Sequence, residues 1–215
     1  MAERNIPGSG YSSKTKNKIL DESTKLFAVK GFGSVSIRDI AKAVGIKEST
    51  IYNYYESKAA LFEDIMSRFE KGYRHYIEWL KAENMRAESL EELMDNMFNR
   101  EFVEMLDPIG CMGISLTLKE QHNIESARKR VFELFHQYSI ESMKTDFDRL
   151  IDKGIIPRCN TKMISMILMY CVLVTNDMRI HEYFGLESSV NYPEMFSNLK
   201  KFITNALRQG DETEI

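Results

Sequence analysis

Residues 47–53 carry a dense run of side chains that can form hydrogen bonds, on a segment with the spacing of a short helix. Serine, threonine, tyrosine and lysine are typical phosphate contacts of nucleic-acid-binding proteins. A carboxylate near DNA either accepts a hydrogen bond from the cytosine amino group or repels phosphate. The chemistry that the run suggests is therefore hydrogen bonding to base edges and phosphates. Its polar members are Lys47, Glu48, Ser49, Thr50, Tyr52 and Asn53.

The elements that must position this run lie within residues 36–58, which have the pattern of short helices joined by a sharp turn. Ser36 and Asp39 form a capping-box pattern, and Gly45 can adopt the positive φ that such a turn requires. This pattern predicts a helix-turn-helix whose second helix can enter a DNA major groove. An ordinary αα-corner in a helical core would show the same spacing. The apolar residues expected to fill the wedge are Ile40, Val44, Ile46, Ile51 and Tyr54.

Apolar residues recur at helical spacing along the rest of the 215-residue chain, and no segment shows the alternation typical of strands. Glycine and proline positions divide the chain into about nine predicted helices, including a helix over 90–106 and a long one over 124–153. The predicted fold class is all-α. We expect a disordered tail over 1–13, a three-helix helix-turn-helix domain over 14–60, a helical body over 61–210 that a long helix joins to it, and a frayed tail over 211–215.

Charge supports this division of the chain. Residues 1–60 carry ten Lys and Arg against six Asp and Glu, a net charge of +4, whereas the remaining residues have a net charge of −7. A basic head on an acidic body that holds every methionine except Met1 indicates two functions in one chain. The longest apolar run, 166–174, is far short of the roughly 18–20 residues of a membrane span. With three widely spaced cysteines and no apolar signal segment, we expect a cytoplasmic protein without a membrane partner.

The head carries a series of residues that match one known family. These residues are Ile19-Leu20, Leu26-Phe27, Gly31-Phe32, Val35 to Ala41, Val44-Gly45-Ile46, Thr50 to Tyr55, Ser57-Lys58 and Leu61-Phe62. Through them the head resembles the TetR family of bacterial transcriptional regulators. This resemblance implies a three-helix DNA-binding head, a helical body that dimerises and binds a small molecule, and repression that the small molecule relieves. Because dimer operators follow the symmetry of the protein, a palindromic operator on double-stranded DNA is implied as well.

The resemblance also implies roles for single residues of the head. Three residues depart from the family pattern: Lys47 stands where a capping Ser is common, Ser49 where Gly is common, and Tyr55 where Phe is common. We expect these departures to leave the fold intact and to change the operator sequence. The expected base contacts are Lys47, Glu48 and Ser49, and the expected phosphate contacts are Ser36, Thr50, Tyr52, Tyr54 and Lys58.

In the body, residues 163–174 are apolar nearly all the way round, so a helix that they form must be buried on both sides. A central core helix would satisfy this requirement. A helix packed on its own core and also against a second copy, as the family's last two helices are, would satisfy it equally. We expect the second arrangement, a homodimer whose interface is formed by Met163, Ile167, Val174, Phe196, Leu199, Phe202, Ile203 and Leu207.

Methionine and aromatic side chains of the body could line a pocket for a small apolar or amphipathic effector of unknown identity. The same side chains could equally be plain core. A DNA-binding regulator whose body binds a protein partner, and no small molecule, is therefore the alternative function. The candidate pocket residues are Met94, Met97, Phe98, Phe102, Met105, Met112, Phe132, Phe135, His136, Met166, Met169 and Tyr170.

Catalysis has little support in the sequence. Glu133 and His136 have the Glu-x-x-His spacing of di-iron bundles, but those sites need a second such motif, which this chain lacks. Asp177 and His181 could share a metal, but no third ligand is evident. Because a glycine-rich phosphate loop and a Gly-x-Ser-x-Gly motif are also missing, we predict a protein that is not an enzyme and binds no metal or cofactor.

Overall fold

The computed structural model describes residues 14–97, 108–183 and 191–209, and every regular element in these ranges is helical, which confirms the all-α prediction. Both predicted tails and residues 98–106 of one predicted helix lie outside these ranges. The first elements are α1 (Lys14–Lys30), α2 (Ile37–Val44), α3 (Glu48–Tyr52) and α4 (Lys58–Asn84). The body continues with α5 (Leu90–Met97), α7 (Pro108–Glu120), α8 (Glu125–Arg130), η1 (Val131–Ser139), α9 (Ile140–Asp152), α10 (Thr161–Tyr183) and α11 (Tyr192–Gln209).

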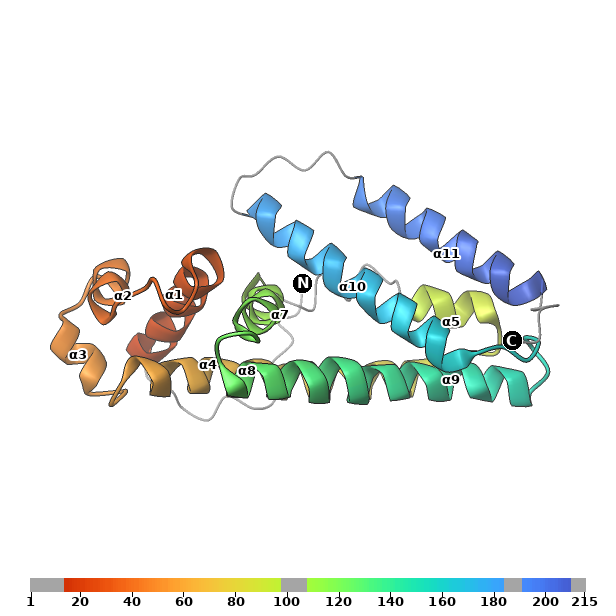
Figure 1. Cartoon of the computed structure of the whole chain (residues 1–215), viewed down its shortest axis with the longest axis horizontal. Helices are drawn as coiled ribbons and strands as arrows, with labels where there is room; N and C mark the ends of the chain where they lie inside the picture. The colour runs from red at the N-terminus through yellow and green to blue at the C-terminus, as the bar shows by residue number, and fades with distance from the viewer. Residues whose placement is uncertain (1–13, 98–107, 184–190, 210–215) are drawn as a thin grey trace.

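Helices α1, α2 and α3 form a head at one end of the molecule (Figure 1). Its core is built around Phe27, Ile40 and Ile51, which are almost wholly buried. This core does not end at residue 60, because Phe62 of α4 and Leu116 of α7 are buried in it as well. The start of α4 and one helix of the body therefore complete the head.

Helix α4 runs from the head into the body and connects these two parts of the molecule (Figure 1). It begins after Ser57, whose hydroxyl accepts a hydrogen bond from the Ala60 N–H at 3.0 Å and so caps the helix. Helix α8 lies alongside it. Arg130 of α8 donates to Glu63 and Glu70 of α4, at 3.2 and 3.3 Å, and fixes the two helices side by side.

The helix predicted over 124–153 forms as one continuous run of helical residues, but its middle third, η1, is a π-helix. The π register matches a tertiary contact. Ser139 Oγ donates to the Leu134 carbonyl, five residues back, at 2.7 Å, and lies 2.8 Å from the Tyr73 hydroxyl of α4. Gly154, with a φ of +70°, ends the run.

The core of the body lies between α4, α9 and α10, with Leu134, Phe135, Phe147 and Leu150 fully buried. Helix α10 packs on α7 and α9, and α11 contacts α5. In Figure 1, α11 lies on the other side of α10 from α4 and α9. None of the helices among the described residues is long and apolar enough to cross a membrane.

Candidate nucleic-acid interface

The predicted sharp turn lies between α2 and α3. Gly45 has a φ of +78°, and its N–H donates to the Ala41 carbonyl at 2.9 Å. Ala41, Val44 and Ile51 are buried between the two helices. One predicted wedge residue is wrong: Tyr54 is 37% exposed, whereas Tyr55 is buried. The reason is that α3 ends at Tyr52, so the next residues turn and direct Tyr55 inward.

Helix α3 presents its polar side chains to solvent. Lys47, Glu48 and Ser49 are all exposed, and Tyr52 is 54% exposed. As predicted from the missing serine, Lys47 is the N-cap residue of α3 and makes no side-chain capping hydrogen bond. Thr50 is half-buried. The geometry thus gathers the predicted base contacts and Tyr52 on one exposed short helix, next to a turn whose apolar side is buried.

Ser36 is the N-cap of α2 and forms the predicted capping box with Asp39. Its hydroxyl donates to Asp39 Oδ2 at 2.6 Å and accepts from the Asp39 N–H at 3.2 Å. The hydrogen bonds from Ser36 hold the pKa of the Asp39 carboxyl below its usual value. Ser36 therefore fixes the start of α2, and the capping box already occupies its hydroxyl proton.

Lys58, the other predicted phosphate contact at a helix start, is also engaged within the chain. Its Nζ donates to the carbonyls of Phe32 and Val35, both at 2.8 Å, and lies 4.3 Å from the centre of the Phe32 ring. Two of the three ammonium protons are thus used to hold the turn between α1 and α2. One proton remains for a phosphate.

A partly buried chain of polar contacts, not expected from the sequence, links α1 and the segment that follows α3 to α4. The Tyr55 hydroxyl donates to Asp64 Oδ2 at 2.8 Å, and Lys16 Nζ lies 2.9 Å from the same oxygen. Burial and the bond to Asp64 raise the pKa of Tyr55. Burial acts to raise the pKa of Asp64, but Lys16 and Tyr55 outweigh it and lower that pKa. In the sequence, the only indication of this contact is Tyr55, which stands where the family commonly has Phe.

This head matches a known family. Residues 19–65, which contain α2, the turn and α3, match the family model described as bacterial regulatory proteins, tetR family. The head is therefore a DNA-binding domain of the TetR type. The helix-turn-helix is thereby distinguished from an ordinary αα-corner, which was the alternative at the level of spacing.

Two similar bacterial proteins are named as HTH-type transcriptional regulators. YttP of Bacillus subtilis, named a probable HTH-type transcriptional regulator, is 36% identical over 78 residues, which are 36% of this chain and only 37% of YttP. IcaR of Staphylococcus aureus, named a negative transcriptional regulator of the biofilm operon icaADBC, is 24% identical over 146 residues, or 63% of this chain and 77% of IcaR.

Solved structures of TetR-like fold cover almost the whole chain. GusR of Salmonella enterica has a TM-score of 0.61 at 19% identity and covers 90% of this chain and 95% of its own. The fatty acid degradation regulator FadR of Bacillus halodurans has a TM-score of 0.61 at 16% identity and covers 93% and 99%. At these identities the likeness shows the fold alone.

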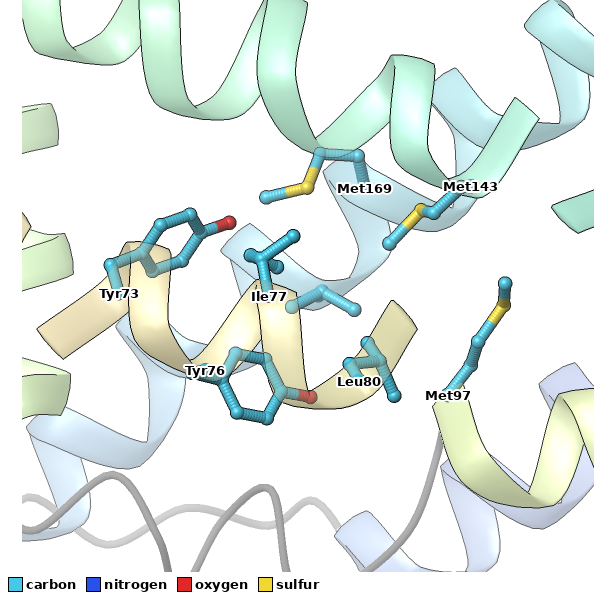
Figure 2. A pocket seen from close by; sticks show the side chains of 8 residues that line it. Tyr73, Tyr76, Ile77, Leu80, Met97, Met143 and Met169 are labelled. Atoms are coloured by element: carbon cyan, nitrogen blue, oxygen red, sulfur yellow. The ribbon is translucent and has the colours of Figure 1, made fainter. Parts of the chain in front are cut away.

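The body of the chain contains a small apolar cavity of about 20 Å³, room for about one water molecule. It lies between α4, α5, α9 and α10 (Figure 2). Of the predicted pocket residues, Met97 and Met169 line it. The other lining residues, which sequence reasoning missed, are Tyr73, Tyr76, Ile77, Leu80, Met143 and Val172.

The remaining predicted pocket residues that the structure describes do not line this cavity. Met94, Met112 and Phe135 are fully buried core residues, whereas Phe132, Met166 and Tyr170 are exposed. His136 is half-buried, with its Nδ1 3.4 Å from the Tyr170 hydroxyl. Phe98, Phe102 and Met105 lie outside the described residues.

The predicted dimer residues divide into an exposed and a buried group. Met163, Ile167 and Val174 of α10 and Phe202 of α11 are between 46% and 70% exposed. This exposed set is here called the apolar face. Leu199 is half-buried and packs against the core, and Ile203 and Leu207 are buried in it. The side chain of Phe196 lies outside the described residues.

In the part of the chain that the structure describes, no three His, Cys, Asp or Glu side chains gather as metal ligands would. Glu133 is exposed and His136 contacts Tyr170, so this Glu-x-x-His pair lies at the surface of η1. The side chains of Asp177 and His181 lie outside the described residues.

Proposed function

We propose that this protein is a transcriptional repressor that binds a palindromic operator as a homodimer and leaves it when a small apolar or amphipathic effector binds the body. The observation that carries the proposal is the exposed polar face of α3 on a helix-turn-helix whose residues match the family model. The name of IcaR, a negative transcriptional regulator, supports repression. Within the head, Ser36, Thr50, Tyr52, Tyr54 and Lys58 are the proposed phosphate contacts.

Substitutions on α3 should separate affinity from sequence preference. Tyr52→Phe removes one exposed hydroxyl, so we expect about fivefold weaker binding to every duplex tested. Lys47→Ala and Glu48→Ala remove side chains that can contact base edges and should change which sequence is selected from random DNA. Selection with each variant, followed by anisotropy titrations, measures both effects. Identical selected sequences for wild type, Lys47→Ala and Glu48→Ala would exclude base recognition by these residues.

The apolar face is the proposed dimer interface, because large apolar side chains exposed at helical spacing on α10, together with the exposed Phe202 of α11, are typical of an interaction site. Introducing a charge there should weaken association: Ile167→Glu is expected to raise the dimer dissociation constant by at least about tenfold. Sedimentation velocity over a concentration series measures this. Lys162→Glu, on an exposed position of the same helix, is the matched control. A dimer that tolerates Ile167→Glu as well as the control uses another surface.

The alternative function, a regulator whose body binds a protein partner, is favoured by one observation. Among the described residues, the cavity of about 20 Å³ is far smaller than a pocket for an organic molecule, which is typically about 300 Å³ or more. An effector would have to displace the Met97, Met143 and Met169 side chains, whose flexibility makes this feasible. A thermal-shift screen over chemically diverse apolar compounds distinguishes the two, because an effector raises the melting temperature by mass action. No shift with any compound would favour the protein-partner function.

A further inference from the structure

The turn between α1 and α2, residues 31–36, is held by side chains from outside the three head helices. We propose that Lys119 and Glu120, the last two residues of the body helix α7, are positioning residues for DNA binding. They hold this turn, and with it the start of α2, in the orientation in which the head meets phosphate. The inference rests on the proposed function, since it assigns a role within DNA binding.

Glu120 is the buried one of these two positioning residues. Its carboxylate, on a residue only 4% exposed, accepts a hydrogen bond from the Phe32 N–H at 2.8 Å. A Cβ at Gly31 would lie 3.3 Å from the same oxygen, and Gly31 has a φ of +81°. A glycine at this position therefore serves both the left-handed backbone and the close approach of the carboxylate. A hydrogen bond from one specific turn amide to a charged carboxylate is stronger than a bond to a neutral acceptor, so it fixes the position of the turn.

Lys119 is the exposed one of the two. Its Nζ donates to the carbonyls of Ala28 and Val29, at 3.2 and 2.9 Å, which belong to the last turn of α1. The final carbonyls of a helix have no partners within the helix, and a cation there also interacts favourably with the helix dipole. Lys119 therefore caps a head helix from the body.

Lys119 and Glu120 contact the segment that leads directly to the start of α2, where the head is proposed to meet DNA. The Phe32 N–H donates to Glu120 of α7, and the Phe32 carbonyl accepts from Lys58 of α4. Both helices therefore bind the backbone of the same residue. Four residues later the chain reaches Ser36, the N-cap of α2. Below this contact Leu116 of α7 is buried in the core of the head, which makes α7 a rigid support (α7 lies beside α1 in Figure 1).

The test measures binding of the full-length protein to a duplex that the wild type selects from random DNA, over a series of salt concentrations. Glu120→Ala and Lys119→Met are each expected to weaken binding about tenfold. Glu120→Gln keeps an acceptor oxygen and should stay within about twofold of wild type. Lys129→Met removes the same charge from an exposed body position and should bind like wild type. If Glu120→Ala does not fold, Lys119→Met carries the test, because it removes only an exposed ammonium group.

Two readouts separate positioning from other roles. The slope of log affinity against log salt should be unchanged in Lys119→Met, because each lost phosphate contact would reduce it by about one. Amide exchange at Phe32 in the DNA-free protein should be faster in Glu120→Ala and close to wild type in Glu120→Gln. Unchanged affinity in both variants, or a reduced salt slope in Lys119→Met, would overturn the positioning role. Failure of the wild type to select any duplex would overturn the proposed function and this role with it.

Discussion

Replacing Gly113 by alanine should destabilise the protein by about 2–3 kcal/mol, because helix α7 approaches α4 with no room for a methyl group. A Cβ at Gly113 would lie 2.5 Å from Cδ2 and 2.7 Å from Cγ of Phe69. Phe69 is itself buried, and its Cβ would be only 3.1 Å away, so the ring cannot simply rotate aside. Either α7 or α4 must move. The free energy of unfolding, measured by urea titration, gives the result.

Gly72→Ala is the matched control for this substitution. Gly72 lies in the middle of α4, and a Cβ there would meet nothing within 4 Å. Alanine is the better helix former, so this variant should gain up to about 1 kcal/mol. The two Gly→Ala substitutions are therefore expected to change stability in opposite directions. A gain for both would show that α7 does not pack on α4 as closely as the structure has it.

The second large effect concerns a buried polar contact where α4 ends against α9. Asn84 Nδ2 donates to Asp146 Oδ2 at 2.6 Å, and Asn84 Oδ1 has no hydrogen-bond partner among the described residues. Burial raises the pKa of Asp146 to about 6, although Asn84, Arg149 and Lys81 lower it in part. The ordinary value is 3.8, so between these values the folded chain holds a proton that the unfolded chain releases.

The direction in which stability changes with pH follows from this proton. The protonated Asp146 side chain contributes fully to the free energy of unfolding below about pH 4. This contribution, of the order of 2 kcal/mol, is lost as pH rises through about 6. Asp146→Asn removes the ionisation and can donate to Asn84, so the variant should be more stable than wild type at about pH 8 by this amount. At about pH 4 the two should be nearly equal. Urea titrations at both pH values measure the difference.

Asp152→Asn controls for the loss of a carboxylate from α9, because Asp152 is exposed on the same helix. Its stability relative to wild type should be nearly the same at the two pH values. A difference between Asp146→Asn and wild type that does not grow with pH would mean that Asp146 is ionised in the folded protein.

The features that the sequence predicted correctly depend on residues close together in the chain. The capping box of Ser36 and Asp39 spans four residues, and the turn at Gly45 depends on one glycine with a positive φ. Both require only local hydrogen bonds and backbone geometry. The all-α fold is equally local, since helical spacing of apolar residues is visible in any window of the chain.

Features that depend on distant partners were not predicted. The π register of η1 accompanies a contact between Ser139 and Tyr73, which are far apart in the sequence. Lys58 was assigned to phosphate, yet it also holds two carbonyls of the turn after α1. The hydrogen bond of the Tyr55 hydroxyl requires Asp64 of the next helix. In each case the side chain could form several contacts, and only packing of the helices selects one.

The residues of the pocket and of the apolar face could likewise be predicted only in part, because they too depend on distant partners. Apolar spacing identified Met97 and Met169 as inward-facing, but Phe132 and Met166 have the same character and are exposed. Amino-acid type gives the apolar side of a helix. It does not show whether that side meets the chain's own core, a second copy or a ligand, because this depends on which helices lie opposite.

The salt dependence of binding to a selected palindromic duplex tests the central claim most directly. If the head binds DNA through α3 and the start of α2, the logarithm of the association constant must fall linearly with the logarithm of salt concentration. The slope should be about −0.9 for each phosphate neutralised. A dimer with several phosphate contacts in each half-site should therefore show a slope of several units. No selectable duplex, or an association constant that does not change with salt, would contradict the assignment.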